Sequence, residues 1–289
     1  MSELIIRDCS PRDGLQPLDP IKPSQRAELV RRLEGAGLRR IEVASFVSPR
    51  AVPAMAEAAA VLAELGPSDA YWVLVPNRRG AEIALDAGAT QLTVTVSASE
   101  GYSEKNTQRS IAASLEAFAE IRATAPDAVL DVVISCCFGS PFEPIRPTDV
   151  ASLVHRLAEL GADLCTLADT TGTATPARLT EVLALTGIDH GLHLHDSRGT
   201  ALVNAYAGFQ AGVRRFDTSL GGLGGSPFAP GAGGNLATED LVLVMEDLGV
   251  DTGIELDELL VVSRWLAEEL SVVMPSRVSA AGPLEERAR

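Results

Sequence analysis

The alternation of short apolar runs with longer stretches of helical periodicity constrains this fold most. The runs predict eight strands, at residues 4–8, 40–44, 71–75, 91–97, 129–135, 164–169, 191–195 and 215–218. Helices are predicted near residues 23–35, 53–65, 77–87, 107–124, 147–160, 176–185, 199–211, 236–248 and 255–270. Short Ala-Gly or Leu-Gly-Ala turns lead from several helices into the next strand. Strands connected by helices in this way pair in parallel.

Eight strand–helix units without a break in composition predict one α/β domain, a (β/α)8 TIM barrel, over residues 1–289. We place the barrel at about residues 4–250 and a C-terminal helical extension at about 251–289. A doubly wound parallel sheet is the alternative fold. In a barrel, the reactive side chains follow the C-terminal ends of the strands, so we examine those positions for chemistry.

Charge and cysteine content exclude several classes of protein. The chain has 24 Lys and Arg against 39 Asp and Glu, and this acidity argues against nucleic acid or an anionic membrane as a partner. Its four cysteines show no CxxC spacing, so neither a zinc knot nor a disulfide framework is indicated, and none is expected at the barrel mouth. Without a signal-peptide pattern or a long apolar span, the sequence predicts a cytoplasmic protein.

His193 and His195 are the most informative pair. They are two residues apart on a predicted strand, so both side chains point to the same side, which in a barrel is the interior. Two core histidines paired with neighbours would be the structural alternative, but burying both imidazoles is costly unless each has a partner. We therefore predict that they bind a metal.

The remaining ligand candidates are Asp13, after the first strand, and Asn235, at the end of the glycine-rich segment 221–235. Two imidazoles, a carboxylate and an amide oxygen suit an octahedral divalent ion, Mg2+ or Mn2+, better than tetrahedral zinc. Neither of the two lysines, Lys22 and Lys105, is predicted inside the barrel, which disfavours Schiff-base chemistry.

Arg12 precedes Asp13 in the sequence, and its planar guanidinium group is always charged. In isolation it would be read as a surface arginine in a turn, but beside a metal ligand it can stabilise an enolate or thioester oxygen. Other polar residues are also predicted at the mouth: Gln16 after the first strand, Glu42 and Ser45 on the second, and Asp169 on the sixth.

Five segments then indicate a family. "PRDGLQ" at 11–16, "IEVASFVSPRAVPAMA" at 41–56, "ADTTG" at 168–172, "HLHD" at 193–196 and "GGLGGSPFAPGAGGNLATEDL" at 221–241 resemble 3-hydroxy-3-methylglutaryl-CoA lyase, of the DRE-TIM metallolyases. The resemblance runs from about residue 4 to 250. It implies a TIM barrel and a metal-dependent carbon–carbon lyase that cleaves a 3-hydroxy-3-substituted acyl-CoA into an acyl-CoA and a 3-oxo acid.

The same resemblance implies roles for individual residues. It implies a metal site of Asp13, His193, His195 and Asn235, with Glu239 as a supporting acid, and catalytic roles for Arg12, Asp13, His193, Glu42 and Ser226. Substrate contacts are expected at Gln16, Ser45, Asp169, Gly224 and Gly225. The glycines would let the loop fold closely over the mouth.

Two departures from the family pattern stand out. Ser226 occupies the position of the family's loop cysteine, and a hydroxyl is a much weaker acid than a thiol. Residues 271–274, "SVVM", replace polar and basic residues that help hold the CoA end.

The sequence supports three hypotheses about function. The first is a metal-dependent carbon–carbon lyase that acts on a 3-hydroxy-3-substituted acyl-CoA or a related acyl thioester. The second is an aldolase or Claisen-type condensing enzyme that uses a 2-oxo acid at the same site. The third is a catalytically idle, metal-stabilised barrel, which has no need of Arg12 beside Asp13. By analogy with similar barrels, a homodimer is the expected assembly.

Overall fold

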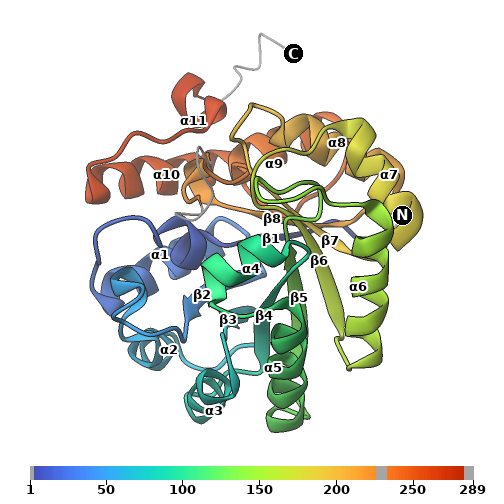
Figure 1. The fold of residues 1–289 in the computed structure, drawn as a ribbon. Helices are drawn as coiled ribbons and strands as arrows, with labels where there is room; N and C mark the ends of the chain where they lie inside the picture. Colours follow the sequence, from blue (N-terminus) through green and yellow to red (C-terminus); the bar gives the residue numbers. More distant parts are fainter. Residues whose placement is uncertain (1–2, 226–232, 283–289) are drawn as a thin grey trace.

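The structure, a computed structural model, describes residues 3–225 and 233–282. In this part of the chain the strands are β1 (Ile5–Asp8), β2 (Ile41–Ser45), β3 (Tyr71–Leu74), β4 (Gln91–Ser97), β5 (Val129–Ser135), β6 (Leu164–Asp169), β7 (Gly191–Leu194) and β8 (Arg215–Thr218). Each strand pairs in parallel with the next, and β8 pairs with β1. The sheet is therefore closed (Figure 1), which confirms the predicted barrel and excludes the doubly wound sheet.

Helices surround this barrel (Figure 1). They are α1 (Pro23–Gly35), α2 (Ala58–Leu65), α3 (Arg78–Asp86), α4 (Glu100–Thr107), α5 (Ile111–Thr124), α6 (Pro147–Glu159), α7 (Pro176–Thr186), α8 (Ala201–Ala211), α9 (Thr238–Asp247), α10 (Leu256–Leu270) and α11 (Arg277–Ala281). Capping side chains begin several of them: Asn77, Ser110 and Thr175 each accept from a backbone amide three residues on. None of the helices among the described residues combines the length and apolarity that a membrane span requires.

The predicted helices differ from the observed ones at three places. Helix α4 was not predicted, because its sequence is polar and contains a glycine; the Ser99 hydroxyl caps it by accepting from the Tyr102 amide. Lys105, expected in a loop, lies on this helix. Left-handed backbone at Glu57 (φ 58°) and Gln108 (φ 57°) interrupts the predicted helices 53–65 and 107–124, so that α2 and α5 begin late.

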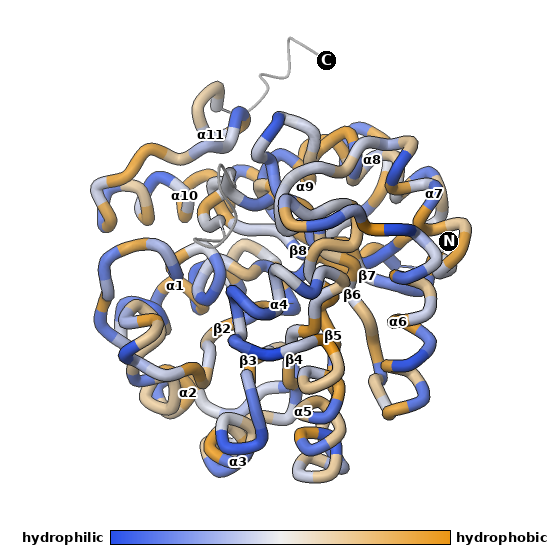
Figure 2. The backbone as a smooth tube through the Cα atoms, viewed as in Figure 1, coloured by the Kyte–Doolittle hydropathy of each residue, from blue (hydrophilic) through white to orange (hydrophobic). Residues whose placement is uncertain are grey.

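The core lies between the barrel and its helices. Its largest fully buried side chains include Phe118, Phe138 and Phe216. In Figure 2 hydrophobic and hydrophilic residues alternate along the surrounding helices, as expected when one helical face packs on the sheet. Helix α10 packs against α1, where the Arg32 guanidinium lies 4.4 Å from the centre of the Trp265 ring. Helix α10 thus packs on the first helix of the barrel.

Gly37, in the turn from α1 to β2, is required by both backbone and packing. Its φ of 106° disfavours any residue with a Cβ, and a Cβ there would collide with the Gly253 carbonyl. We expect Gly37→Ala to destabilise the protein by about 1–3 kcal/mol or more, measured by denaturant unfolding. Gly35→Ala is the matched control. Nothing lies within 4 Å of the added methyl group, and at this last residue of α1 alanine has a higher helix propensity than glycine. Equal stability of the two variants would contradict this account.

Candidate metal centre

A single turn of π-helix, η1 (Ser10–Gly14), places Asp13 above the end of β1. The backbone amides of Arg12, Asp13 and Gly14 all donate to the Cys9 carbonyl, at 3.1, 2.7 and 3.2 Å. This tight turn leaves the Asp13 carboxylate facing the barrel mouth, beside the ends of β7 and β8. The local sequence Ser-Pro-Arg-Asp-Gly therefore folds to present one carboxylate at a defined position.

His193 lies on β7 and His195 directly follows that strand, and both are buried. Their Nε2 atoms lie 3.3 Å apart and point toward each other. Each Nδ1 has a separate partner: Asp217 Oδ2 at 3.2 Å for His193, and the Gly233 carbonyl at 3.2 Å for His195. The two imidazoles therefore converge through one nitrogen each, as metal-binding histidines do.

Asn235 reaches the same point from the far end of the glycine-rich segment. Its Nδ2 donates to Asp13 Oδ2 at 2.7 Å and to the Leu223 carbonyl at 2.9 Å. Gly224 (φ 109°) lies against both residues, and a Cβ there would meet the Asn235 amide and the Asp13 carboxylate. This glycine is needed for close approach of the backbone to the site.

Asp13, His193 and His195 each offer one ligand atom, and these atoms all lie within 4.8 Å of one another. Two imidazole nitrogens and a carboxylate oxygen at this spacing fit a divalent metal ion. Asn235 is adjacent, and its amide oxygen is the atom that would join them. The described residues thus bring together all four predicted ligands.

The electrostatics favour the forms that bind a metal. Burial acts to raise the pKa of Asp13, but the Arg12 guanidinium and His193 outweigh it and lower that pKa to about 2. Burial, and then the neighbouring His193, lower the pKa of His195 to about 4. For His193, burial acts to lower the pKa, but its hydrogen bond to Asp217 and the charge of Asp217 raise it overall. At neutral pH a carboxylate and at least one neutral imidazole are therefore ready to bind.

Arg12 is buried next to this group. Its Nε donates to Glu42 Oε2 at 2.6 Å, its Nη2 lies 2.5 Å from the same oxygen, and its Nη1 donates to Asp13. The other oxygen of Glu42, Oε1, is buried and has no hydrogen-bond partner among the described residues. The guanidinium is thus held between two carboxylates beside the metal-binding group.

The remaining predicted residues lie at the strand ends without joining this group directly. Ser45 is the buried last residue of β2, and Gln16, which is half-buried, follows η1. Asp169 accepts from the backbone amides of Thr173 and Ala174, so it organises its own loop, and burial raises its pKa to about 6. Gly225 adopts a φ of 131°, which favours glycine.

Glu239, predicted to support the metal ligands, contacts other groups. It accepts from the Gly221 amide at 2.9 and 3.0 Å and from the hydroxyls of Ser263 on α10 and Ser279 on α11. These hydrogen bonds join the start of the glycine-rich segment to the C-terminal helices. Ser226 lies outside the described residues.

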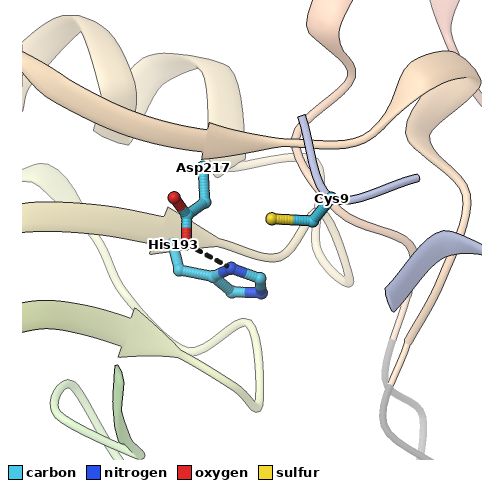
Figure 3. Close-up of side chains that lie close together, drawn as sticks. All are labelled: Cys9, His193 and Asp217. Atoms are coloured by element: carbon cyan, nitrogen blue, oxygen red, sulfur yellow. Dashed lines mark hydrogen bonds and ion pairs between the residues drawn. The ribbon is translucent and has the colours of Figure 1, made fainter. Parts of the chain in front are cut away.

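Sequence reasoning missed two groups at the site. Cys9 was not expected near the mouth, yet its Sγ lies within 4.8 Å of ligand atoms of His193 and Asp217, and the three side chains lie close together (Figure 3). Asp217 was assigned only to a strand. A signal was present, because an aspartate within a buried strand requires a partner.

The sequence is similar to known lyases along nearly its whole length. Residues 3–266 match the family model described as HMGL-like. The chain is 40% identical to (R)-citramalyl-CoA lyase of Chloroflexus aurantiacus, over 98% of this chain and 96% of that protein. It is 39% identical to hydroxymethylglutaryl-CoA lyase of Pseudomonas mevalonii, over 97% of each. The sequence similarity thus spans almost the full length of two lyases.

Solved structures of HMG-CoA lyases have the same fold as this chain. An HMG-CoA lyase from Acinetobacter baumannii, in complex with coenzyme A and 3-methylmalate, has a TM-score of 0.93 at 38% identity, over 98% of this chain and 96% of that chain. The Bacillus subtilis HMG-CoA lyase has a TM-score of 0.92 at 36% identity, over 97% and 98%. The barrel and its C-terminal helices are therefore similar in arrangement to these lyases.

Substitution of a ligand tests the metal centre. We expect His193→Ala to weaken Mn2+ binding by more than the roughly 10–100-fold typical of losing a supporting residue, because it removes a ligand. Isothermal titration calorimetry measures this, and His155→Ala, an exposed histidine on α6, is the control. In the wild type, affinity should fall as pH drops through the raised pKa of His193, because protonation occupies Nε2. Unchanged binding by His193→Ala would refute the assignment.

Proposed function

The chain belongs to the HMGL-like family and is a carbon–carbon lyase, and we propose that it cleaves a 3-hydroxy-3-substituted acyl-CoA at the site of Asp13, His193 and His195. The products would be an acyl-CoA and an oxo acid. The observation that carries the proposal is the convergence of three side chains that could hold a metal beside a buried arginine, in a barrel that resembles the solved HMG-CoA lyase structures. A scaffold protein would not need this combination.

We further propose Mg2+ or Mn2+ as the metal, with Asn235 as the fourth protein ligand. Oxygen and imidazole ligands with room for water suit these ions. When bound, such an ion supplies Lewis-acid chemistry, which lowers the pKa of the substrate hydroxyl and polarises its carboxylate. The residues at the site keep the Asp13 carboxylate ionised and both Nε2 atoms directed to one point.

Arg12 and Glu42 are positioned for the remaining steps. A guanidinium has five N–H donors, more than its contacts with Glu42 and Asp13 use, so Arg12 can also donate to the thioester oxygen. Glu42 Oε1 has no other partner among the described residues, and it can accept the hydroxyl proton. As that proton leaves, the oxygen forms a carbonyl, the C–C bond breaks, and its electron pair forms the thioester enolate beside Arg12. Protonation of the enolate carbon completes the reaction.

The alternative function is condensation, with a 2-oxo acid as acceptor at the same site. The metal-binding group and Arg12 suit cleavage and condensation equally, because each reaction passes through an enolate next to a carbonyl. Near-complete coverage of two lyases favours cleavage. Coenzyme A bound to the Acinetobacter enzyme supports an acyl-CoA as the partner of this chain.

Incubation with a small panel of thioesters tests the function. With Mg2+ or Mn2+, we expect cleavage of citramalyl-CoA, 3-hydroxy-3-methylglutaryl-CoA or a longer 3-alkyl analogue, detected as free oxo acid. Chelation should abolish turnover, and Asp13→Asn should lower kcat/KM by several orders of magnitude, because it removes a charged ligand. Intact thioesters throughout, with product formed only from a 2-oxo acid and an acyl-CoA, would support the condensing enzyme instead.

Ser226 provides a separate test. If a hydroxyl stands where the family uses a thiol for proton transfer, Ser226→Cys should raise kcat, because a thiol ionises far more readily than a hydroxyl. We expect an increase of about 10-fold or more, up to the roughly 100- to 10,000-fold that a general acid–base group contributes. Ser226→Ala is the control. Equal rates for all three forms would show that this position takes no part in proton transfer.

A further inference from the structure

Three charged side chains lie inside the barrel, below the metal-binding group. Arg7 on β1, Asp131 on β5 and Asp217 on β8 are 5%, 1% and 6% exposed. Arg7 donates to both oxygens of Asp217, from Nε at 2.8 Å and from Nη2 at 2.7 Å, and its Nη1 lies 2.9 Å from Asp131. A bidentate contact of this kind fixes a carboxylate in both position and orientation.

The oriented carboxylate then contacts a metal ligand. Asp217 Oδ2, which already accepts from Arg7, lies 3.2 Å from His193 Nδ1 (Figure 3). Because both oxygens of Asp217 accept from the permanently charged Arg7 guanidinium, the carboxyl group is held as a carboxylate. An ionised carboxylate can only accept hydrogen bonds, so the proton must be on Nδ1 of His193. The neutral imidazole then has its lone pair on Nε2, which faces His195 and Asp13.

We propose that Asp217, held by Arg7 from inside the barrel, is a positioning residue that fixes the tautomer and ring orientation of His193 for metal binding. This inference rests on the proposed metal centre but not on the identity of the substrate. His195 differs, since its Nδ1 donates to the neutral Gly233 carbonyl. Asp217 therefore supplies the carboxylate of a carboxylate–histidine–metal arrangement, which raises the basicity of the ligand nitrogen.

Asp217→Asn tests the inference, with Asp131→Asn as the matched control. An amide has one oxygen where the carboxylate has two, so it cannot accept from Arg7 twice and from His193 as well. Asp131 is also buried and also pairs with Arg7, but it contacts Thr166 where Asp217 contacts His193. Both variants remove one buried negative charge next to Arg7.

We expect Asp217→Asn to weaken Mn2+ binding about 10–100-fold by isothermal titration calorimetry, and Asp131→Asn to change it less than about threefold. Circular dichroism and thermal unfolding check that each variant is folded. Equal affinities for the wild type and a folded Asp217→Asn would overturn the inference, as would equal losses in both variants, because those would reflect the charge network as a whole.

The histidine tautomer is a direct measurement that does not depend on either aspartate variant folding. The chain has four histidines, so long-range 15N–1H spectra of the metal-free wild type at alkaline pH can be assigned with His193→Ala. We expect the His193 proton on Nδ1. A proton on Nε2 would overturn the inference even if neither aspartate variant folds.

Failure of this inference and failure of the proposed function are distinguishable. If the wild type binds Mn2+ tightly, Asp217→Asn binds it more weakly, and no thioester is cleaved, the inference is supported and the proposed substrate is refuted. If the wild type cleaves a thioester and Asp217→Asn binds Mn2+ as well as the wild type does, the proposed function is supported and the inference is refuted.

Discussion

Hydrogen bonding between the first and last strands is the constraint on which the site depends. Strand β1 pairs with β8 over four positions, from Ile5 opposite Arg215 to Asp8 opposite Thr218. This pairing closes the barrel, so the turn after β1 and the segment after β8 lie side by side. Asp13 and Asn235, 222 residues apart in sequence, are thereby brought within hydrogen-bonding distance. An open sheet would leave them at opposite edges.

Closure also places charged groups in a confined interior, where each needs a partner. The structure meets this need with ion pairs at two levels: Arg7 with Asp131 and Asp217 inside the barrel, and Arg12 with Glu42 and Asp13 at the mouth. His193 connects the two levels, because one nitrogen contacts Asp217 and the other faces the metal-binding group. The buried charges therefore do more than neutralise one another, since they also orient the side chains of the proposed metal centre.

The glycine-rich segment is shaped by the same crowding. Gly224 lies against Asp13 and Asn235, while a Cβ at Gly221 or Gly222 would meet Met274 or Pro275 of the C-terminal region. Glu239 accepts from the Gly221 amide and from two serines on α10 and α11. The C-terminal helices thus contact the start of the segment whose far end carries Asn235. A glycine is needed at Gly224, because the backbone there lies against Asp13 and Asn235.

The amino-acid sequence by itself determined the strand–helix alternation, and with it the barrel and the mouth at which Asp13, His193 and Asn235 were sought. These follow from local periodicity and from the spacing of two histidines on one strand face. Contacts between distant segments were decided only by the tertiary structure. The partner of His193, the position of Cys9 close to it, and the connection of Glu239 to the C-terminal helices all depend on barrel closure and helix packing, which no local pattern records. The left-handed backbone at Glu57 and Gln108 likewise made α2 and α5 begin later than periodicity alone predicted.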